Sequence, residues 1–418
     1  MNRQAAIQDS LSNQASAPGT VRAFPYPYRA MLAICSDLDE TPDRHVYREI
    51  MRYLNTTETT MMGEGVGLEV GNSIYFDMPP DQFAYWNTDD AGREMVRQLI
   101  KSGHIDCFHS YGDMAVTRRH AGIALEELAR HDCRMQVWID HGTAPTNFGS
   151  DIMQGHGDEP GSPVFHADLT CQHGVEYVWR GRVTSVIGQD ARRRLGGLWN
   201  RRHPLTSAST LAKESTKGLL AHVGDRKYRM HASNRLLQEV QLRSGHVVQE
   251  FLRSNPHWGG VSSHETADGL ADVLSENMLS RLVEREGVCV LYTHLGKVRR
   301  HDEPFGRATR EALARLACHF RQGSILVTTT RRALGYCRMR RDIDVALVRE
   351  GDSWRVNVTT NAPAADLDGL TVFVPEPLRT RMNVNGLSVT LEPHSMSEGS
   401  GCVSIPWRRL GFPDLGHD

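Results

Sequence analysis

The chain has 418 residues, 39% of them hydrophobic, which is enough for two or three domains with a sizeable core. Its 48 basic and 50 acidic residues give a formal charge of -2, so the composition shows no electrostatic signature of binding to nucleic acid or to an anionic membrane. No stretch approaches the roughly 18 apolar residues of a membrane span, and the N-terminus has no apolar signal-peptide centre, so we expect a cytoplasmic protein.

The first predicted strand leads into a pair of aspartates. Residues 1–22 are polar and are expected to form a flexible N-terminal segment. The apolar run 31–35 predicts a buried strand, and Asp37 and Asp39 follow it directly. The carboxyl ends of parallel strands carry the chemistry in barrels and open α/β sheets. The two aspartates are therefore the first candidates for a functional site.

A second predicted strand is followed by histidine and aspartate. A helix is predicted over 89–101, because acidic residues lie at its start and a glycine lies just past its end. The short run 105–108 then predicts a buried strand, and His109 and Asp113 lie beyond its carboxyl end. Several titratable residues within so short a stretch favour a site over a polar loop.

Two further predicted strands end in the same way. The strand over 135–139 is followed by Asp140 and His141, and the strand over 288–293 is followed by His294. Parallel strands would bring these residues to the same edge of the sheet as the two aspartates.

Strands alternate with helices along residues 23–340, which predicts a parallel sheet covered by helices. The length favours an α/β fold with a distorted or incomplete (β/α) barrel. The region 200–257 is polar, basic and partly helical, and the sequence does not place it in this architecture. From about residue 343 the apolar residues alternate, and Asn385-Gly386 indicates a hairpin turn. Residues 341–418 are therefore expected to form a small antiparallel β-sandwich domain.

The motifs at these strand ends resemble those of the NodB-type polysaccharide deacetylases. The stretch GHIDCFHSYGD at 103–113 is similar to the family's second motif, with His109 and Ser110 matching its His-Thr pair. The stretch GVCVLYTHLGK resembles its last motif, which ends in a histidine at the position of His294. The resemblance covers about 31–340 and implies a (β/α) barrel of NodB type.

The resemblance also implies a metal site and a pair of catalytic groups. It assigns Asp37 as the base and Asp39 as a metal ligand, with the opposite assignment left open. It assigns His109 as a second ligand and His294 as the general acid, which suits a side chain that titrates near neutrality. Asp113 stands near the family's other histidine ligand and is expected to replace it. The arginine of the family's third motif is not found after the strand over 135–139.

Other polar residues are candidates for substrate binding. Asp140 and His141 follow the third strand, and His264 lies at a predicted helix start, where helix capping explains it equally well. His141 is also an alternative nitrogen ligand for the metal, should Asp113 point elsewhere. The oxygen-rich ligand set favours zinc, with manganese, cobalt and iron also suitable.

The resemblance therefore implies a metal-dependent hydrolase that removes an acyl group, such as N-acetyl, from an amino sugar or a surface-polysaccharide precursor. In the cytoplasm the substrate would be a nucleotide-linked or lipid-linked amino sugar. The sequence does not name the sugar or the oligomeric state.

Two alternatives compete with this prediction. The run from Asp37 to Thr41 also resembles the first motif of haloacid-dehalogenase-type phosphatases, in which Asp37 would be a nucleophile, magnesium would bind nearby and Lys297 could serve as the lysine. A catalytically inactive, carbohydrate-binding barrel is the other alternative, favoured by the altered ligand and the missing arginine.

Overall fold

The computed structural model describes residues 17–37, 41–199, 204–224, 226–255, 266–396 and 401–415. The chain divides into two compact units. The larger unit is Ala30–Leu334 with Arg409–Asp418, and the smaller unit is Met1–Arg29 with Gly335–Arg408. The sequence predicted one boundary between residues 340 and 341, whereas here the segment after Arg408 belongs to the larger unit.

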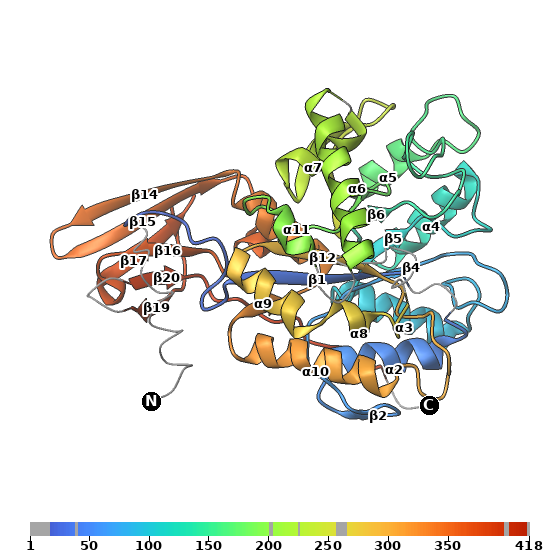
Figure 1. The fold of residues 1–418 in the computed structure, drawn as a ribbon, viewed down its shortest axis with the longest axis horizontal. Helices are drawn as coiled ribbons and strands as arrows, with labels where there is room; N and C mark the ends of the chain where they lie inside the picture. Colours follow the sequence, from blue (N-terminus) through green and yellow to red (C-terminus); the bar gives the residue numbers. More distant parts are fainter. Residues whose placement is uncertain are drawn as a thin grey trace. The chain divides into compact units, whose positions relative to one another are not determined.

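The larger unit is built on a curled, half-barrel sheet of 11 strands that pair in parallel, except for one antiparallel pair at the edge (Figure 1). The mixed α/β class and the distorted-barrel shape agree in outline with the prediction. The strands are β1 (Ala30–Ser36), β4 (Asn72–Ile74), β5 (Ile105–His109), β6 (Val137–Ile139), β7 (Tyr177–Trp179), β8 (Val183–Thr184), β9 (Leu237–Gln241), β10 (Val247–Phe251), β11 (Arg253–Ser254), β12 (Val288–Thr293) and β13 (Ile325–Val327).

Strand β1 lies at the centre of this sheet and is buried along its whole length. Its sequence AMLAICS is apolar on both faces, as expected of a parallel strand covered on both sides. It pairs with β12 over six residues, with β13 at its start and with β4 at its end. The carboxyl ends of β1, β4 and β12 therefore lie together.

The region 200–257, which the sequence did not place, supplies the strands that connect β7 with β12 in the sheet. Strands β10 and β11 are consecutive pieces of the segment 247–254. The first piece pairs with β7, and the second pairs with both β8 and β12. Backbone pairing therefore passes from β7 to β12 through this one segment, with β9 added antiparallel to β10.

Three helices of the larger unit begin at side-chain caps, and one of them is the helix predicted over 89–101. Asp43 accepts hydrogen bonds from the backbone at the start of α2, Asp89 caps α3, and Thr117 caps α4. The helices and 3₁₀ turns of the larger unit are α2 (Arg44–Asn55), α3 (Asp90–Lys101), α4 (Arg118–Arg130), α5 (Ala167–His173), η1 (Leu195–Leu198), α6 (Pro204–His222), η2 (Arg226–Tyr228), α7 (Arg229–Ser233), α8 (Leu270–Val273), α9 (Glu276–Arg285), α10 (Arg307–Arg321) and the first half of α11 (Thr330–Met339). The strands β2 (Thr59–Thr60) and β3 (Gly63–Glu64) form a separate short hairpin.

The smaller unit contains two small sheets. One is formed by β14 (Ile343–Glu350), β15 (Ser353–Thr360), β17 (Thr380–Val384) and β18 (Leu387–Ser388), and the other by β16 (Thr371–Val374), β20 (Gly401–Ser404) and β19 (Glu392–Ser395). Pairing is antiparallel except between β15 and β17, which run parallel, so the prediction of an all-antiparallel domain was wrong at this pair. The predicted turn at Asn385-Gly386 is confirmed, because both residues have positive φ.

The N-terminal segment is partly ordered against the smaller unit. Residues 1–16 lie outside the described residues, but Gly19 donates a backbone hydrogen bond to Phe373 and Arg22 donates one to Thr371. The prediction of a flexible segment over 1–22 was therefore wrong for its last residues, which extend the edge beside β16. Within the described ranges, no helix has the length and apolar character needed to cross a membrane.

Candidate functional site

The candidate site lies where the central strands of the curled sheet end. Asp37 follows β1, Tyr75 follows β4, His109 is the last residue of β5, and His294 follows β12. Because β1 pairs directly with β4 and β12, and β4 with β5, these residues meet at one edge of the sheet. The prediction that these strand ends come together is therefore correct for Asp37, His109 and His294.

The centre of the site is an ion pair between Asp37 and Arg253. Nη1 of Arg253 lies 2.9 Å from Oδ2 of Asp37, and Nη2 lies 2.7 Å from Oδ1. Both residues are buried, with 1% of Asp37 and none of Arg253 exposed to solvent. Arginine and carboxylate thus meet in the bidentate geometry that gives the strongest and most directional pairs.

Arg253 is fixed by aromatic rings as well as by the carboxylate. Its guanidinium carbon lies 4.1 Å from the ring centre of Trp179 and 4.7 Å from that of Tyr292. Its Nε also donates to Sγ of Cys35, at 3.2 Å. Strands β7, β12 and β1 carry these three neighbours, so the arginine is oriented by the sheet itself.

The ion pair keeps the carboxylate charged. Burial by itself raises the pKa of Asp37, but the positive charge of Arg253, followed by the neighbouring His109, outweighs burial and leaves this pKa below its usual value. Burial likewise opposes the charged form of Arg253, yet the charge of Asp37 raises the pKa of the guanidinium. Asp37 is therefore an oriented, ionised carboxylate at neutral pH.

Two histidines flank this carboxylate. Nε2 of His109 lies 3.5 Å from Oδ2 of Asp37, and Nε2 of His294 lies 3.9 Å from the same oxygen. Both histidines are at least 95% buried. These separations exceed those of good hydrogen bonds but place both rings within the range of strong electrostatic interaction with the carboxylate.

A second pair of polar residues lies next to His109. The ring centre of His109 is 4.6 Å from that of Tyr75 and 4.7 Å from that of His141. Nδ1 of His141 lies 3.0 Å from Oδ1 of Asp113, whose side chain is 48% exposed. Asp113 thus contacts His141, the residue that the sequence offered as the alternative metal ligand.

The imidazoles of His109 and His141 have the donor chemistry of a zinc site. A histidine that binds a metal usually donates its other ring N–H to a carboxylate, and Asp113 places a carboxylate oxygen 3.0 Å from Nδ1 of His141. No cluster of three or more histidine, cysteine, aspartate or glutamate residues suited to a metal occurs among the residues that the structure describes. The predicted ligand Asp39 lies outside those residues, as does the predicted substrate-binding residue His264.

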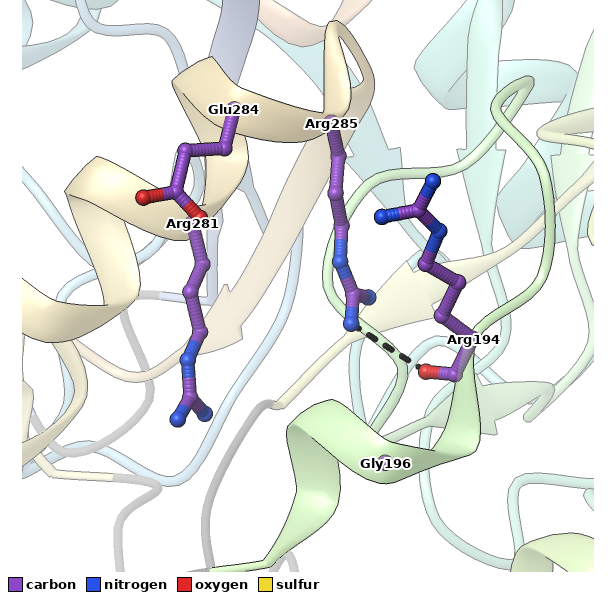
Figure 2. Close-up of a pocket in the computed structure, with 5 residues that line it drawn as sticks. All are labelled: Arg194, Gly196, Arg281, Glu284 and Arg285. Atoms are coloured by element: carbon purple, nitrogen blue, oxygen red, sulfur yellow. Dashed lines mark hydrogen bonds between the residues drawn. The ribbon is translucent and has the colours of Figure 1, made fainter.

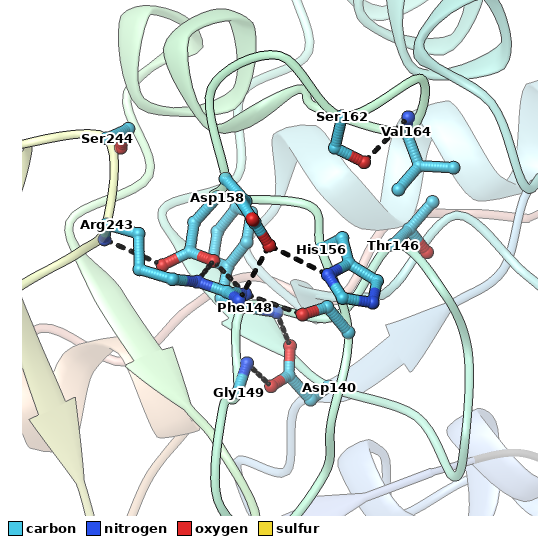
Figure 3. A network of polar contacts seen from close by, with 12 residues as sticks. Asp140, Thr146, Phe148, Gly149, His156, Asp158, Ser162, Val164, Arg243 and Ser244 are labelled. Carbon is cyan, nitrogen blue, oxygen red and sulfur yellow. Dashed lines mark hydrogen bonds and ion pairs between the residues drawn. The ribbon is translucent and has the colours of Figure 1, made fainter.

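Asp140 holds a loop in place. Its carboxylate accepts hydrogen bonds from the backbone of Phe148 and Gly149, both at 2.8 Å (Figure 3), and from Nε1 of Trp138. It is completely buried, and this burial raises its pKa to about 7. The sequence suggested contact with substrate, but a fully buried carboxylate with both oxygens bonded to the protein is placed to anchor the loop that carries His141. We therefore assign it an anchoring role.

The rest of this loop is tied to the hairpin between β9 and β10. Asp158 is 1% exposed and accepts hydrogen bonds from the backbone and from Nε of Arg243, at 2.9 and 2.7 Å (Figure 3). His166 is also buried and lies 2.9 Å from the backbone oxygen of Thr146. These contacts support the segment around His141 from below, so its position does not depend on exposed side chains.

Sequence reasoning missed the residues that orient Asp37. Arg253 follows an apolar stretch in the region that was left unplaced, and its position just after apolar strand residues was the only available signal. Tyr292 lies in the predicted strand over 288–293, but nothing in the sequence marked Tyr292 or Trp179 as a neighbour of an arginine. Lys297, the predicted phosphatase lysine, lies three residues after His294 and donates its backbone N–H to that residue's carbonyl.

No family model matches the chain, and no curated protein sequence matches it.

Proposed function

We propose that the chain is a metal-dependent hydrolase of amide bonds that removes an acyl group from an amino sugar. The observation that supports this most strongly is the buried ion pair of Asp37 and Arg253, flanked by His109 and His294 at the carboxyl edge of a parallel sheet. Burying so many titratable groups at one place costs stability, which is typical of a functional site.

Asp37 would act as the general base. Hydrolysis of an amide requires a group that takes a proton from the attacking water. Arg253 holds the carboxylate ionised and aims it, but it also lowers the pKa of Asp37, which makes the carboxylate a weak base. A divalent metal, when bound, supplies the missing driving force by making water more acidic and by polarising the acyl carbonyl.

The chain offers nitrogen donors for that metal at the end of β5 and in the loop after β6. His109 and His141 would hold it, with Asp113 orienting the ring of His141 through Nδ1. The family resemblance adds Asp39 as an oxygen ligand. Such a set suits zinc, with manganese, cobalt or iron as the other candidates. In this proposal Asp113 supports a ligand, which changes the role that the sequence gave it.

His294 would protonate the leaving amine. Its Nε2 lies 3.9 Å from the carboxylate that takes the first proton, so acid and base belong to one small site. Imidazole is the side chain best suited to deliver a proton at neutral pH. The substrate class follows the resemblance: an N-acetyl amino sugar, nucleotide-linked or lipid-linked, that serves as a precursor of a surface polysaccharide in the cytoplasm.

The phosphatase alternative is less consistent with the site. The phosphatase mechanism gives no role to His109 and His294, whose Nε2 atoms lie 3.5 and 3.9 Å from Oδ2 of Asp37. An inactive carbohydrate-binding barrel would not need a buried carboxylate between two histidines.

The test is acetate release from N-acetyl amino sugars by zinc-loaded protein, beside an Asp37→Asn variant. Loss of a general base should lower kcat by roughly a hundredfold or more while the metal stays bound. Full activity of the variant would contradict the assignment of Asp37. Release of phosphate from phosphate esters with magnesium, lost in the same variant, would support the phosphatase instead.

A further inference from the structure

A second, separate pocket lies at the opposite end of the sheet from Asp37. It has a volume of about 560 Å³ and is lined by Arg194, Gly196, Arg281, Glu284 and Arg285 (Figure 2). Helix α9 and the segment around η1 supply these residues, and α9 ends just before β12 begins. The catalytic candidate His294 follows the other end of β12, six residues and about 20 Å away along the strand.

The charge of this pocket is strongly positive. Three arginines and one glutamate line it, so its side chains carry a net charge of +2. Arg281 and Arg285 are four residues apart on α9 and extend side by side, while Arg194 approaches from the facing segment (Figure 2). The charges of Arg281 and Arg194 both oppose that of Arg285, and Glu284 is the one acidic side chain among the five lining residues.

Arg285 is held in place by neutral groups. It donates hydrogen bonds to the backbone oxygens of Ile187, at 2.7 Å, and Arg194, at 3.1 Å. Carbonyl oxygens fix the guanidinium without neutralising its charge. Burial and then the charges of Arg281 and Arg194 lower the pKa of Arg285, so the surrounding protein disfavours its charged form.

Some arginines elsewhere in the larger unit are paired with acids. Arg307 pairs with Glu311 at 2.7 Å, and Arg243 pairs with Asp158. Within the described part of the chain, by contrast, neither Arg194 nor Arg285 forms an ion pair with an acidic side chain. Arg194 and Arg285 therefore bring positive charge to the pocket that no acidic side chain of the described residues pairs with.

We propose that this pocket binds the phosphoryl group of a small molecule. Guanidinium groups match the geometry and charge of phosphoryl oxygens, and a doubly charged phosphoryl group would balance the net charge of the pocket. The volume is within the range of small-molecule sites, about 300–1,000 Å³, and exceeds what one phosphate fills. The inference does not depend on the proposed hydrolase activity, because it concerns different residues at the other end of β12.

Calorimetric titration tests this proposal, with inorganic phosphate, inorganic diphosphate and phenyl phosphate as probes. All titrations are made in chloride at one ionic strength, because salt screens such contacts. The variants are Arg194→Gln and Arg281→Gln, which leave the backbone contacts of Arg285 in place. Arg307→Gln, on the exposed face of α10, is the matched control, and Asp37→Asn separates this pocket from the catalytic candidate.

We expect saturable binding of the probes by the unmodified chain, weakened about tenfold or more in Arg194→Gln and Arg281→Gln and unchanged in the other two variants. Binding of phenyl phosphate at least as tight as that of phosphate would identify an organic phosphate as the ligand, and binding of the inorganic ions alone would identify free phosphate. Either result supports a phosphoryl site. The absence of binding of all three probes would overturn the proposal, as would affinities that the arginine variants leave unchanged or that Asp37→Asn abolishes.

Discussion

The guanidinium of Arg253 and the carboxylate of Asp37 form a two-point ion pair across 216 positions of the sequence, with nitrogen-to-oxygen distances of 2.7 and 2.9 Å. The pair joins β11 to the end of β1. Two properties follow from it: the stability of this edge of the sheet, and the charge of the proposed base.

Removing one partner of this buried pair should destabilise the protein strongly. Arg253→Met leaves the Asp37 carboxylate buried without its counter-ion, and such changes lower the free energy of unfolding by about 3–5 kcal/mol. The double variant Asp37→Asn, Arg253→Met removes both charges and should recover part of that loss. Urea denaturation measures both effects. Arg307→Met is the control, because it loses only an exposed ion pair, and its free energy of unfolding should lie within about 0.5 kcal/mol of that of the unmodified chain. A double variant no more stable than Arg253→Met would contradict the view that the unpaired carboxylate causes the loss.

The stability of the larger unit should depend on the protonation of Asp140. Its pKa is raised to about 7 in the folded chain by burial, against about 3.9 in an unfolded chain. The folded form therefore binds this proton more tightly, and the stability from this group is complete below pH 4 and falls as the pH rises toward 7. Asp106, whose pKa burial raises to about 6, acts in the same direction.

The variant Asp140→Asn isolates the contribution of the Asp140 carboxyl to the pH dependence of stability. The amide keeps the shape of the side chain but cannot ionise, so the free energy of unfolding of the variant, relative to the unmodified chain, should rise by up to about 2–3 kcal/mol between pH 5 and pH 7. Denaturation curves at the two pH values measure it. A difference between the two proteins that does not change with pH would contradict the raised pKa.

The ring of Trp179 should matter through the position of Arg253. Trp179→Phe keeps an aromatic face under the guanidinium, whereas Trp179→Leu removes it. We expect Trp179→Leu to lower kcat by about tenfold with little change in KM, because the ring contacts no reacting atom, and Trp179→Phe to retain most of kcat. Steady-state kinetics with metal content measured in parallel checks this. A rise in KM with kcat unchanged would point to substrate contact.

The sequence predicted the strand ends but not how they are held. Apolar runs followed by acids or histidines placed Asp37, His109 and His294 at one edge, because the direction of parallel strands is enough to bring such residues together. Arg253 could not be found in this way, since its partner depends on the register of β11, which has only two paired residues and no apolar pattern of its own. Asp140 and Asp37 both follow a predicted strand and both are buried. Only their hydrogen-bond partners distinguish an anchor from a base, and these are the loop backbone for Asp140 and Arg253 for Asp37.

The smaller unit shows the same limit. Alternating apolar residues predicted its strands and the turn at Asn385-Gly386, both of which depend on neighbouring residues. The parallel pairing of β15 with β17 and the addition of residues near Gly19 beside β16 depend on contacts between distant segments. Local periodicity carries no information about such partners.

The contact between Asp113 and His141 predicts a graded effect on metal binding. Asp113→Asn should weaken zinc affinity by about 10–100-fold, because an amide orients the ring less firmly than a carboxylate. Competition with a chromogenic chelator measures the affinity, and Asp302→Asn, which loses an exposed ion pair with Arg300, is the matched control. Unchanged zinc affinity in Asp113→Asn would leave this carboxylate without a role in the site.

The most direct test of the proposed site is elemental analysis of the purified chain after loading with zinc and dialysis, beside His109→Ala and His141→Ala. His156→Ala, which removes an exposed histidine paired with Glu159, is the control. We predict about one zinc ion per chain in the unmodified protein and in the control, and loss of most of it in the other two variants. An unmodified chain that retains no transition metal after loading, or His109→Ala and His141→Ala variants that both retain it in full, would contradict the proposed metal-dependent hydrolase.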